Sequence, residues 1–313
     1  MNELKENSKF GLNRGNLKMI ALFCMTLDHF AGIVLTAWLH TLTKGSFAYI
    51  CDMGLIFFLR LIGRLAFPLF CFFIVEGLIH TRNIYRYAFR LFLLALISEI
   101  PFDLSHSNTL LEFTGQNVFW TLLLGLVAIY CIDGIYSKYK LKKAVRYLLV
   151  FTIAFLAGFV AFTIKSDYGA FGISTIVIIY LVEKEEIFFT PVINAMAIFF
   201  YYFVLANADE IDFAEYAEFS KIVIVVYLVF VLVVSSVVLC LTIFIKNKNA
   251  RKMFAACATL TAMSPDELAA MANVFLMNYY NGEKGKKIGW LFYLYYPLHL
   301  AVLAGICKLL KFY

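Results

Sequence analysis

Long apolar runs separated by short charged clusters constrain this chain more than any other feature. The run LKMIALFCMTLDHFAGIVL, from Leu17 to Leu35, is one of ten such segments, and a helix needs roughly 17–25 residues of this kind to cross a bilayer. With 63% hydrophobic residues in 313, the chain is too apolar for a soluble globular protein. We therefore predict an all-α, polytopic transmembrane helical bundle of about ten spans.

The chain shows no internal repeat and no separate soluble domain, so residues 1–313 are predicted to form one integral-membrane domain. Residues 1–16 would be a cytoplasmic N-terminal segment. The predicted spans cover residues 17–39, 54–79, 88–104, 116–136, 147–165, 169–183, 187–206, 221–245, 253–280 and 288–310.

Basic residues gather before the first span and after the second, fourth and eighth. They are Lys5, Lys9, Arg14 and Lys18; Arg82, Arg86 and Arg90; Lys138, Lys140, Lys142, Lys143 and Arg146; and Lys246, Lys248, Arg251 and Lys252. All four groups fall on one side if the N-terminus is cytoplasmic, as the positive-inside rule requires. The acidic segment 207–220 then faces outward. The net charge of +6 is explained by topology and does not indicate nucleic acid.

The ninth segment contains a helix start in its middle. Ser264, Pro265 and Glu267 stand where a cap, a first-turn proline and a capping-box glutamate belong. The pattern is compatible with one broken helix, a re-entrant pair or an interfacial helix. If the segment were a single crossing, the basic loop NGEKGKK would lie outside, against the charge rule.

Ionisable residues inside apolar spans are costly, so they mark sites by default. Lys18 and His29 are eleven residues apart, which places them on one helix face and roughly 16 Å apart. This stripe suits a long anionic ligand shaped like coenzyme A, with its phosphates at Lys18 and its reactive end at His29. Asp28 points about 100° away and could pair with another helix.

The second span carries Arg64 deep within it, Pro68 as a predicted bend, and Glu76 and His80 on one face at i, i+4. The Glu–His pair could be a proton relay, half of a metal site or an ion pair. We predict no metal, since no second pair lies at similar depth. Arg64 favours anion binding or a buried salt bridge.

Polar groups also stand at the predicted outer ends of spans: Glu99, Asp103, Gln116, Asn117, Asp167 and Tyr168. They could form a pocket for an amine or polyhydroxyl acceptor, or they could simply cap helices. Near the C-terminus, Asn281 centres a turn and His299 lies mid-span after Pro297. A lone histidine on an aromatic face is often a hydrogen-bonded core residue.

Several blocks together resemble the TraX family of membrane proteins. They are LKMIALFCMTLDHFAG, GRLAFPLFCFFIVEGLIHTRN, ISEIPFDLS, QNVFWTLLLGL, SDYGAFGI, LMNYYNGEKGKK and WLFYLYYPLHL. The first span is also similar to family-three membrane acyltransferases and heparan-α-glucosaminide N-acetyltransferases, with Lys18 where those relatives often have arginine. The resemblance implies acyl transfer in a bacterial cytoplasmic membrane.

We therefore expect a membrane-embedded acetyltransferase that moves an acetyl group from cytoplasmic acetyl-CoA to an extracytoplasmic peptide or glycan. His29 would be the general base, with Asp28, Glu76 and His80 in support. Lys18, Arg64, Arg82 and Arg86 would hold the donor, and the outer polar residues the acceptor. Membrane lipid is the other expected partner. The alternative is a proton-coupled small-molecule transporter using His29, Glu76, Glu99 and His299.

Overall fold

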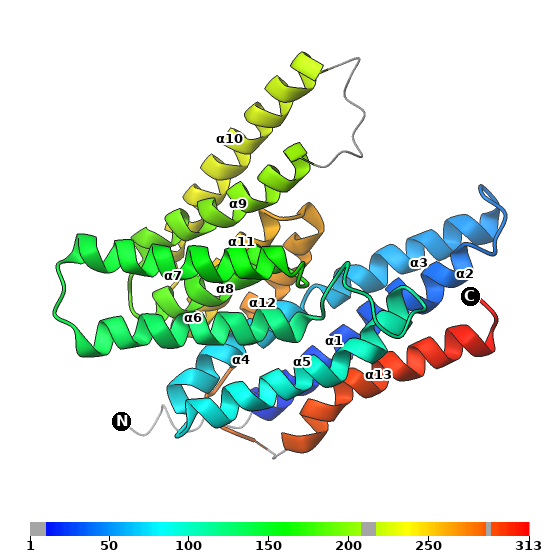
Figure 1. The fold of residues 1–313 in the computed structure, drawn as a ribbon, viewed down its shortest axis with the longest axis horizontal. Coiled ribbons are helices and arrows are strands. Elements are labelled where there is room, and N and C mark those ends of the chain that lie inside the picture. Colours follow the sequence, from blue (N-terminus) through cyan, green and yellow to red (C-terminus); the bar gives the residue numbers. More distant parts are fainter. Residues whose placement is uncertain (1–10, 208–216, 286–288, 313) are drawn as a thin grey trace.

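The fold is seen in a computed structural model that describes residues 11–207, 217–285 and 289–312 (Figure 1). Within these ranges the chain is helical, and its only β contacts are two isolated bridges, Leu12 with Tyr280 and Gln116 with Ser166. Five helical segments are long and apolar enough to cross a membrane. The predicted all-α fold class is confirmed, and the five apolar segments indicate a membrane protein. Most of the acidic segment 207–220 lies outside the described residues.

The helical elements follow in chain order. They are α1 (Arg14–His29), the π-helix η2 (Phe30–Leu35), α2 (Thr36–Leu39), α3 (Phe47–Gly63), α4 (Ala66–His80), α5 (Ile84–His106), α6 (Val118–Lys138), α7 (Lys143–Thr163), α8 (Gly169–Glu183), η3 (Ile187–Phe189), α9 (Thr190–Asn207), α10 (Ala217–Leu241), η4 (Thr242–Phe244), α11 (Lys248–Thr261), η5 (Pro265–Met271), α12 (Ala272–Asn278) and α13 (Gly289–Leu309).

The main core surrounds α8, whose residues from Ala170 to Val182 are all buried. Helices α4, α6, α7, α9 and α11 pack around it (Figure 1). A helix that is apolar on every side belongs inside a bundle, which explains why this segment is shorter than a lipid-facing span. A second, smaller core joins α1 and η2 to α13.

The second predicted span is one helical segment with a break at Arg64 and Leu65, between α3 and α4. The predicted bend is therefore present, and Pro68 explains its position. Proline has no N–H to donate to the carbonyl four residues earlier, and its ring clashes with that carbonyl. For Pro68 that carbonyl belongs to Arg64, so the helix restarts at Ala66 with the proline in its first turn.

The region counted as a ninth span, 253–280, is a helical hairpin, which matches the re-entrant pair among the three arrangements that the sequence left open. Helix α11 leads to a turn at 262–264, and η5 and α12 return along it. A 3₁₀ helix begins at Pro265 as predicted, but the predicted capping box is not formed, because the Ser264 side chain makes no cap hydrogen bond and Glu267 pairs with Arg64. The hairpin returns to the end where it began: Lys252 at its start contacts Glu76, while Asn281 after its end bonds to Leu12, beside the start of α1.

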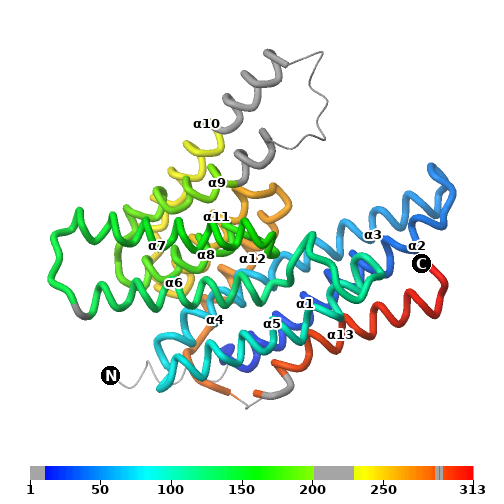
Figure 2. The backbone as a smooth tube through the Cα atoms, viewed as in Figure 1, coloured from blue at the N-terminus to red at the C-terminus, as the bar shows by residue number. Residues whose placement is uncertain are grey.

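The described members of the four basic groups gather at one end of the bundle, which we call the basic end. Ion pairs connect them: Arg14 and Lys252 with Glu76, Lys252 and Lys248 with Glu183, and Lys143 and Arg146 with Glu186. Figure 2 shows the chain returning repeatedly to the side where α1 begins. The described part of the loop after α12, residues 279–285, lies at this end too, so the hairpin removes the conflict with the charge rule.

Candidate functional site

A pocket of about 240 Å³ opens at the basic end between α1, α4, α5, α6 and α13. Arg14, Lys18 and Arg90 line it with their cationic side chains. Its wall is otherwise largely aromatic and aliphatic, with Phe119 and Tyr296 among the lining residues. Cations together with an apolar interior favour a ligand that has an anionic part and an apolar part.

Lys18 contributes a cation that no carboxylate neutralises among the described residues. Its ammonium lies 4.3 Å from the ring centroid of Phe292 and 5.7 Å from that of Phe73. Arg90 is similar, with its guanidinium carbon 5.7 Å from the Tyr293 centroid. Aromatic faces attract cations but leave their N–H groups available to an anion. The pocket wall therefore holds two cations able to bind a ligand.

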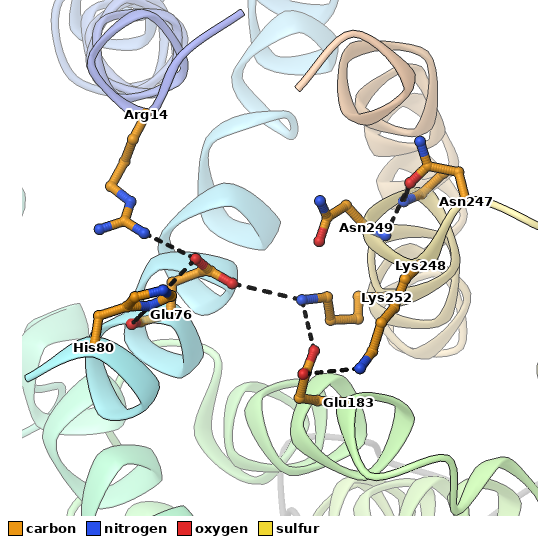
Figure 3. Close-up of polar contacts among 9 residues, drawn as sticks. Arg14, Glu76, His80, Glu183, Asn247, Lys248, Asn249 and Lys252 are labelled. Atoms are coloured by element: carbon orange, nitrogen blue, oxygen red, sulfur yellow. Dashed lines mark hydrogen bonds and ion pairs between the residues drawn. The ribbon is translucent and has the colours of Figure 1, made fainter. Parts of the chain in front are cut away.

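A network of ion pairs adjoins the pocket and involves four helices (Figure 3). Arg14 of α1 lies 2.9 Å from Glu76 of α4, and Lys252 of α11 lies 3.5 Å from the other Glu76 oxygen. Lys252 also lies 2.9 Å from Glu183 of α8. His80 contacts Glu76 at 3.6 Å, as their shared face predicts. Of the three interpretations of the Glu76–His80 pair, the structure shows an ion pair, and Glu76 also binds Arg14 and Lys252.

His29 and His299 form a pair, with His29 Nδ1 2.6 Å from His299 Nε2. His299 Nδ1 lies 2.9 Å from the carbonyl oxygen of Tyr295. A carbonyl only accepts, so His299 carries its proton on Nδ1. When both rings are neutral, His29 donates from Nδ1 and its Nε2 is left without a proton. His29 does not line the pocket, but its ring lies 5.9 Å, edge to face, from that of Tyr296, which does.

Arg64 is the centre of a second polar cluster, at the break between α3 and α4. Its guanidinium lies 2.9 Å from Glu267, 3.2 Å from Asp266 and 3.4 Å from Asp28. It also donates to the Tyr168 hydroxyl at 3.4 Å. Of the two sequence interpretations of Arg64, the structure shows the buried salt bridge. Asp28 pairs with another helix, as predicted. We call these five residues the Arg64 cluster.

The predicted acceptor residues do not converge on one pocket. Glu99 accepts from the Trp120 indole at 2.6 Å and from the backbone N–H of Asn117 at 3.3 Å. Asn117 caps α6 by accepting from Phe119, and its amide donates to Ala95. Asp103 accepts from the backbone of Glu112. These contacts match the capping interpretation.

The remaining predicted residues are divided between the two ends. The backbones of Gln116 and Asp167 bond to one another, and Tyr168 belongs to the Arg64 cluster. Asn281 accepts from the backbone of Glu283 at the basic end. Arg82 and Arg86 are exposed and do not line the pocket. The sequence interpretation assigned the binding of an anionic ligand to Arg82 and Arg86, but the arginines that line the pocket are Arg14 and Arg90.

Residues missed by the sequence interpretation have a common cause. Lys252, Asp266 and Glu267 all belong to the hairpin, whose fold the apolar pattern of 253–280 did not reveal. Asp266 and Glu267 were interpreted only as first-turn residues of a helix. Three carboxylates surround Arg64, and two of them come from the hairpin tip. This cluster could therefore be recognised only once the position of the hairpin tip was known.

Comparison with known proteins gives two matches. The model of the TraX protein family matches residues 13–234 and 211–307. A protein of Dichelobacter nodosus named probable fimbrial assembly protein FimC, serogroup H1, is 29% identical over 299 residues, covering 92% of this chain and 93% of the relative. No solved structure matches the chain.

These matches overturn the expected enzyme and its alternative. The relative is named for fimbrial assembly, and neither match is described as an acyltransferase, a heparan N-acetyltransferase or a transporter. The Lys18–His29 spacing was misleading because it shows only that the two residues share a helix face, and not that one ligand contacts both. Here the histidine binds His299. Since the family model matches most of its length, the chain belongs to the TraX protein family.

Proposed function

We propose that the chain is an integral-membrane factor of fimbrial assembly in a bacterial cytoplasmic membrane. The full-length similarity to a probable fimbrial assembly protein supports the process. The five long apolar segments support the membrane setting. A fimbrial subunit is the proposed extracytoplasmic partner, and membrane lipid surrounds the bundle.

The topology that fits this function has nine crossings, with the basic end in the cytoplasm. The hairpin of α11 and α12 begins and ends at the basic end, so it is not a crossing, and the ten predicted spans become nine. Helix α13 then crosses last. Cys307, near its end, packs against Ile33 at the far side from Arg14.

This topology predicts that the two termini lie on opposite sides of the membrane. A reporter tag fused after Tyr313 should be accessible from outside in intact cells, whereas one fused before Met1 should need permeabilised cells. Labelling with a membrane-impermeant reagent measures both. Equal accessibility of the two tags in intact cells would contradict nine crossings.

The working part of the protein, in this proposal, is the pocket at the basic end. The observation that carries it is Lys18, a cation in the pocket wall without an ion-pair partner among the described residues. Lys18 is half-buried, and a charge that is partly removed from water without an ion-pair partner favours the arrival of an anion. A ligand with an anionic group, entering from the cytoplasm, would provide that partner and place its apolar part among Phe73, Phe119 and Phe292.

Replacing Lys18 with methionine should therefore impair both ligand binding and fimbriation. Methionine keeps the apolar stem and removes the charge-assisted contact, which weakens binding of an anion about tenfold. In a strain lacking its own copy, we would quantify fimbriae sheared from the surface. With purified protein we would measure binding of acetyl-CoA, the anionic probe that the sequence suggested, against phosphatidylglycerol.

Arg82→Met is the matched control, because Arg82 is exposed at the same end and does not line the pocket. It should leave binding and fimbriation unchanged. Normal fimbriation in the strain without the protein would refute the proposed process. Normal fimbriation with Lys18→Met, at wild-type protein level, would refute the role of the pocket while leaving the process standing.

A further inference from the structure

A second cavity, of about 480 Å³, lies between α2, α3 and the tip of the hairpin. We call it the α2–α3 groove. On α3 its lining residues include Met53, Phe57 and Arg60, which recur at helical spacing on one face. Leu39 of α2 lines it as well, and Asp266 of the hairpin tip lies at its edge. The groove is thus apolar apart from a few polar groups, of which Arg60 and Asp266 carry charge.

Arg60 is the more weakly paired of these two charges. Its one ion pair among the described residues is a 3.9 Å contact with Asp28, and its side chain is 41% exposed. Asp28 lies closer to Arg64, at 3.4 Å with the same oxygen. The Arg60 guanidinium rests against Gly32 of η2, where an added Cβ would lie 2.6 Å from Nη1. Most of its five N–H donors therefore have no acceptor in the described part of the protein.

The depth of Arg60 decides what kind of acceptor could reach it. Gly32 is fourteen residues beyond Lys18, so it lies roughly 21 Å along the helix from the basic end. The hydrocarbon core of a bilayer is about 30 Å thick. Arg60 therefore lies inside the core, below the level of lipid head groups. An arginine at that depth faces a partner charge or a polar cavity.

We propose that the α2–α3 groove binds an apolar transmembrane helix of a partner protein, and that a carboxylate on this helix pairs with Arg60. A helix can present a carboxylate at this depth, whereas an anionic lipid holds its charge at the interface. The lining residues on α3 run from Met53 to Leu61, about 12 Å or two turns, which matches the contact of one helix side. Asp266 would repel the carboxylate and so restrict it to Arg60. This proposal does not rest on the function proposed for the pocket.

The test uses a synthetic helix of about twenty leucine and alanine residues with a single glutamate at its centre. A second peptide carries glutamine there, which matches the shape of neutral glutamate. Full-length protein in phosphatidylcholine vesicles carries a fluorescent donor and each peptide an acceptor, and energy transfer reports binding. The wild type should bind the glutamate peptide about tenfold more tightly than the glutamine peptide.

Variants identify the residue responsible. Arg60→Gln should bind both peptides equally, and Arg60→Lys, which keeps the charge, should retain part of the preference. Arg82→Gln, exposed at the basic end, should behave as the wild type. Retained preference in Arg60→Lys also shows that the groove is folded.

Three outcomes would overturn the proposal. In the first, the wild type binds the two peptides equally, or binds neither. In the second, oleate displaces the glutamate peptide from the wild type at equal membrane concentration, which would make a fatty acid the occupant. In the third, Phe57→Ala dissociates a dimer of the protein in the absence of peptide, which would make a second copy the occupant.

Discussion

Replacing Arg64 with methionine should destabilise the folded protein by about 3–5 kcal/mol, a large fraction of the total stability of a typical folded domain. Arg64 is 8% exposed and lies within 3.4 Å of three carboxylates, on Asp28, Asp266 and Glu267. Methionine fills similar space but leaves those carboxylates without their main partner. Arg60, at 3.9 Å from Asp28, can compensate for one of them only.

The measurement is the fraction of protein that remains monodisperse after heating in detergent, followed by size-exclusion chromatography. Arg82→Met is the control, since replacing this exposed arginine should change the free energy of unfolding by no more than about 0.5 kcal/mol. Adding Glu267→Gln to Arg64→Met should recover part of the loss, because it removes one uncompensated charge from a side chain that is 0% exposed. Equal melting of Arg64→Met and the wild type would show that the cluster contributes no stability.

The second large effect is expected at Gly63, at the end of α3. A Cβ added there would lie 2.3 Å from the Cβ of Asp28, which sits on α1. The two helices must separate to accept it, and overpacking of this kind costs about 1–3 kcal/mol. Separation would also move Asp28 away from Arg64, whose contact is 3.4 Å. Gly63→Ala should therefore melt at a lower temperature than the wild type in the same heating assay.

Gly54 provides the matched control in the same helix. A Cβ at Gly54 meets nothing within 4 Å, so Gly54→Ala should gain the helix propensity of alanine, about 1 kcal/mol or less. The two substitutions are chemically identical and should shift the melting temperature in opposite directions. If both raised it, the close approach of α1 and α3 at Asp28 would be wrong.

Local patterns in the sequence predicted local structure well. The apolar runs predicted the helices, the basic clusters predicted a common end, and Pro68 predicted a break that the structure places at Arg64. The helix start at Pro265 was predicted too. The break and the helix start depend on residues within one or two turns of each other, and the common end follows from the rule that basic residues stay on the cytoplasmic side.

Pairings between distant residues could not be predicted in the same way. His29 and His299 were each singled out, but nothing in their spacing of 270 residues shows that they touch. Glu76 was paired only with His80 in its own helix, and the fold also brings it Arg14 and Lys252. The hairpin explains much of this difference, because its apolar composition resembles a crossing while its two arms return to one end.

The hydrogen bonds between the hairpin and the break between α3 and α4 have a consequence for the synthesis of the protein. Glu267 reaches Arg64 across 203 positions, and the Asn273 amide reaches the Leu65 carbonyl across 208. A ribosome delivers the second span to the membrane long before either partner exists. During that interval the described partners of Arg64 are Asp28 and, once α8 has been made, the Tyr168 hydroxyl. Until the hairpin is made, the N-terminal helices therefore lack these contacts. A chain truncated before Lys248 would never form them and should be degraded by membrane proteases.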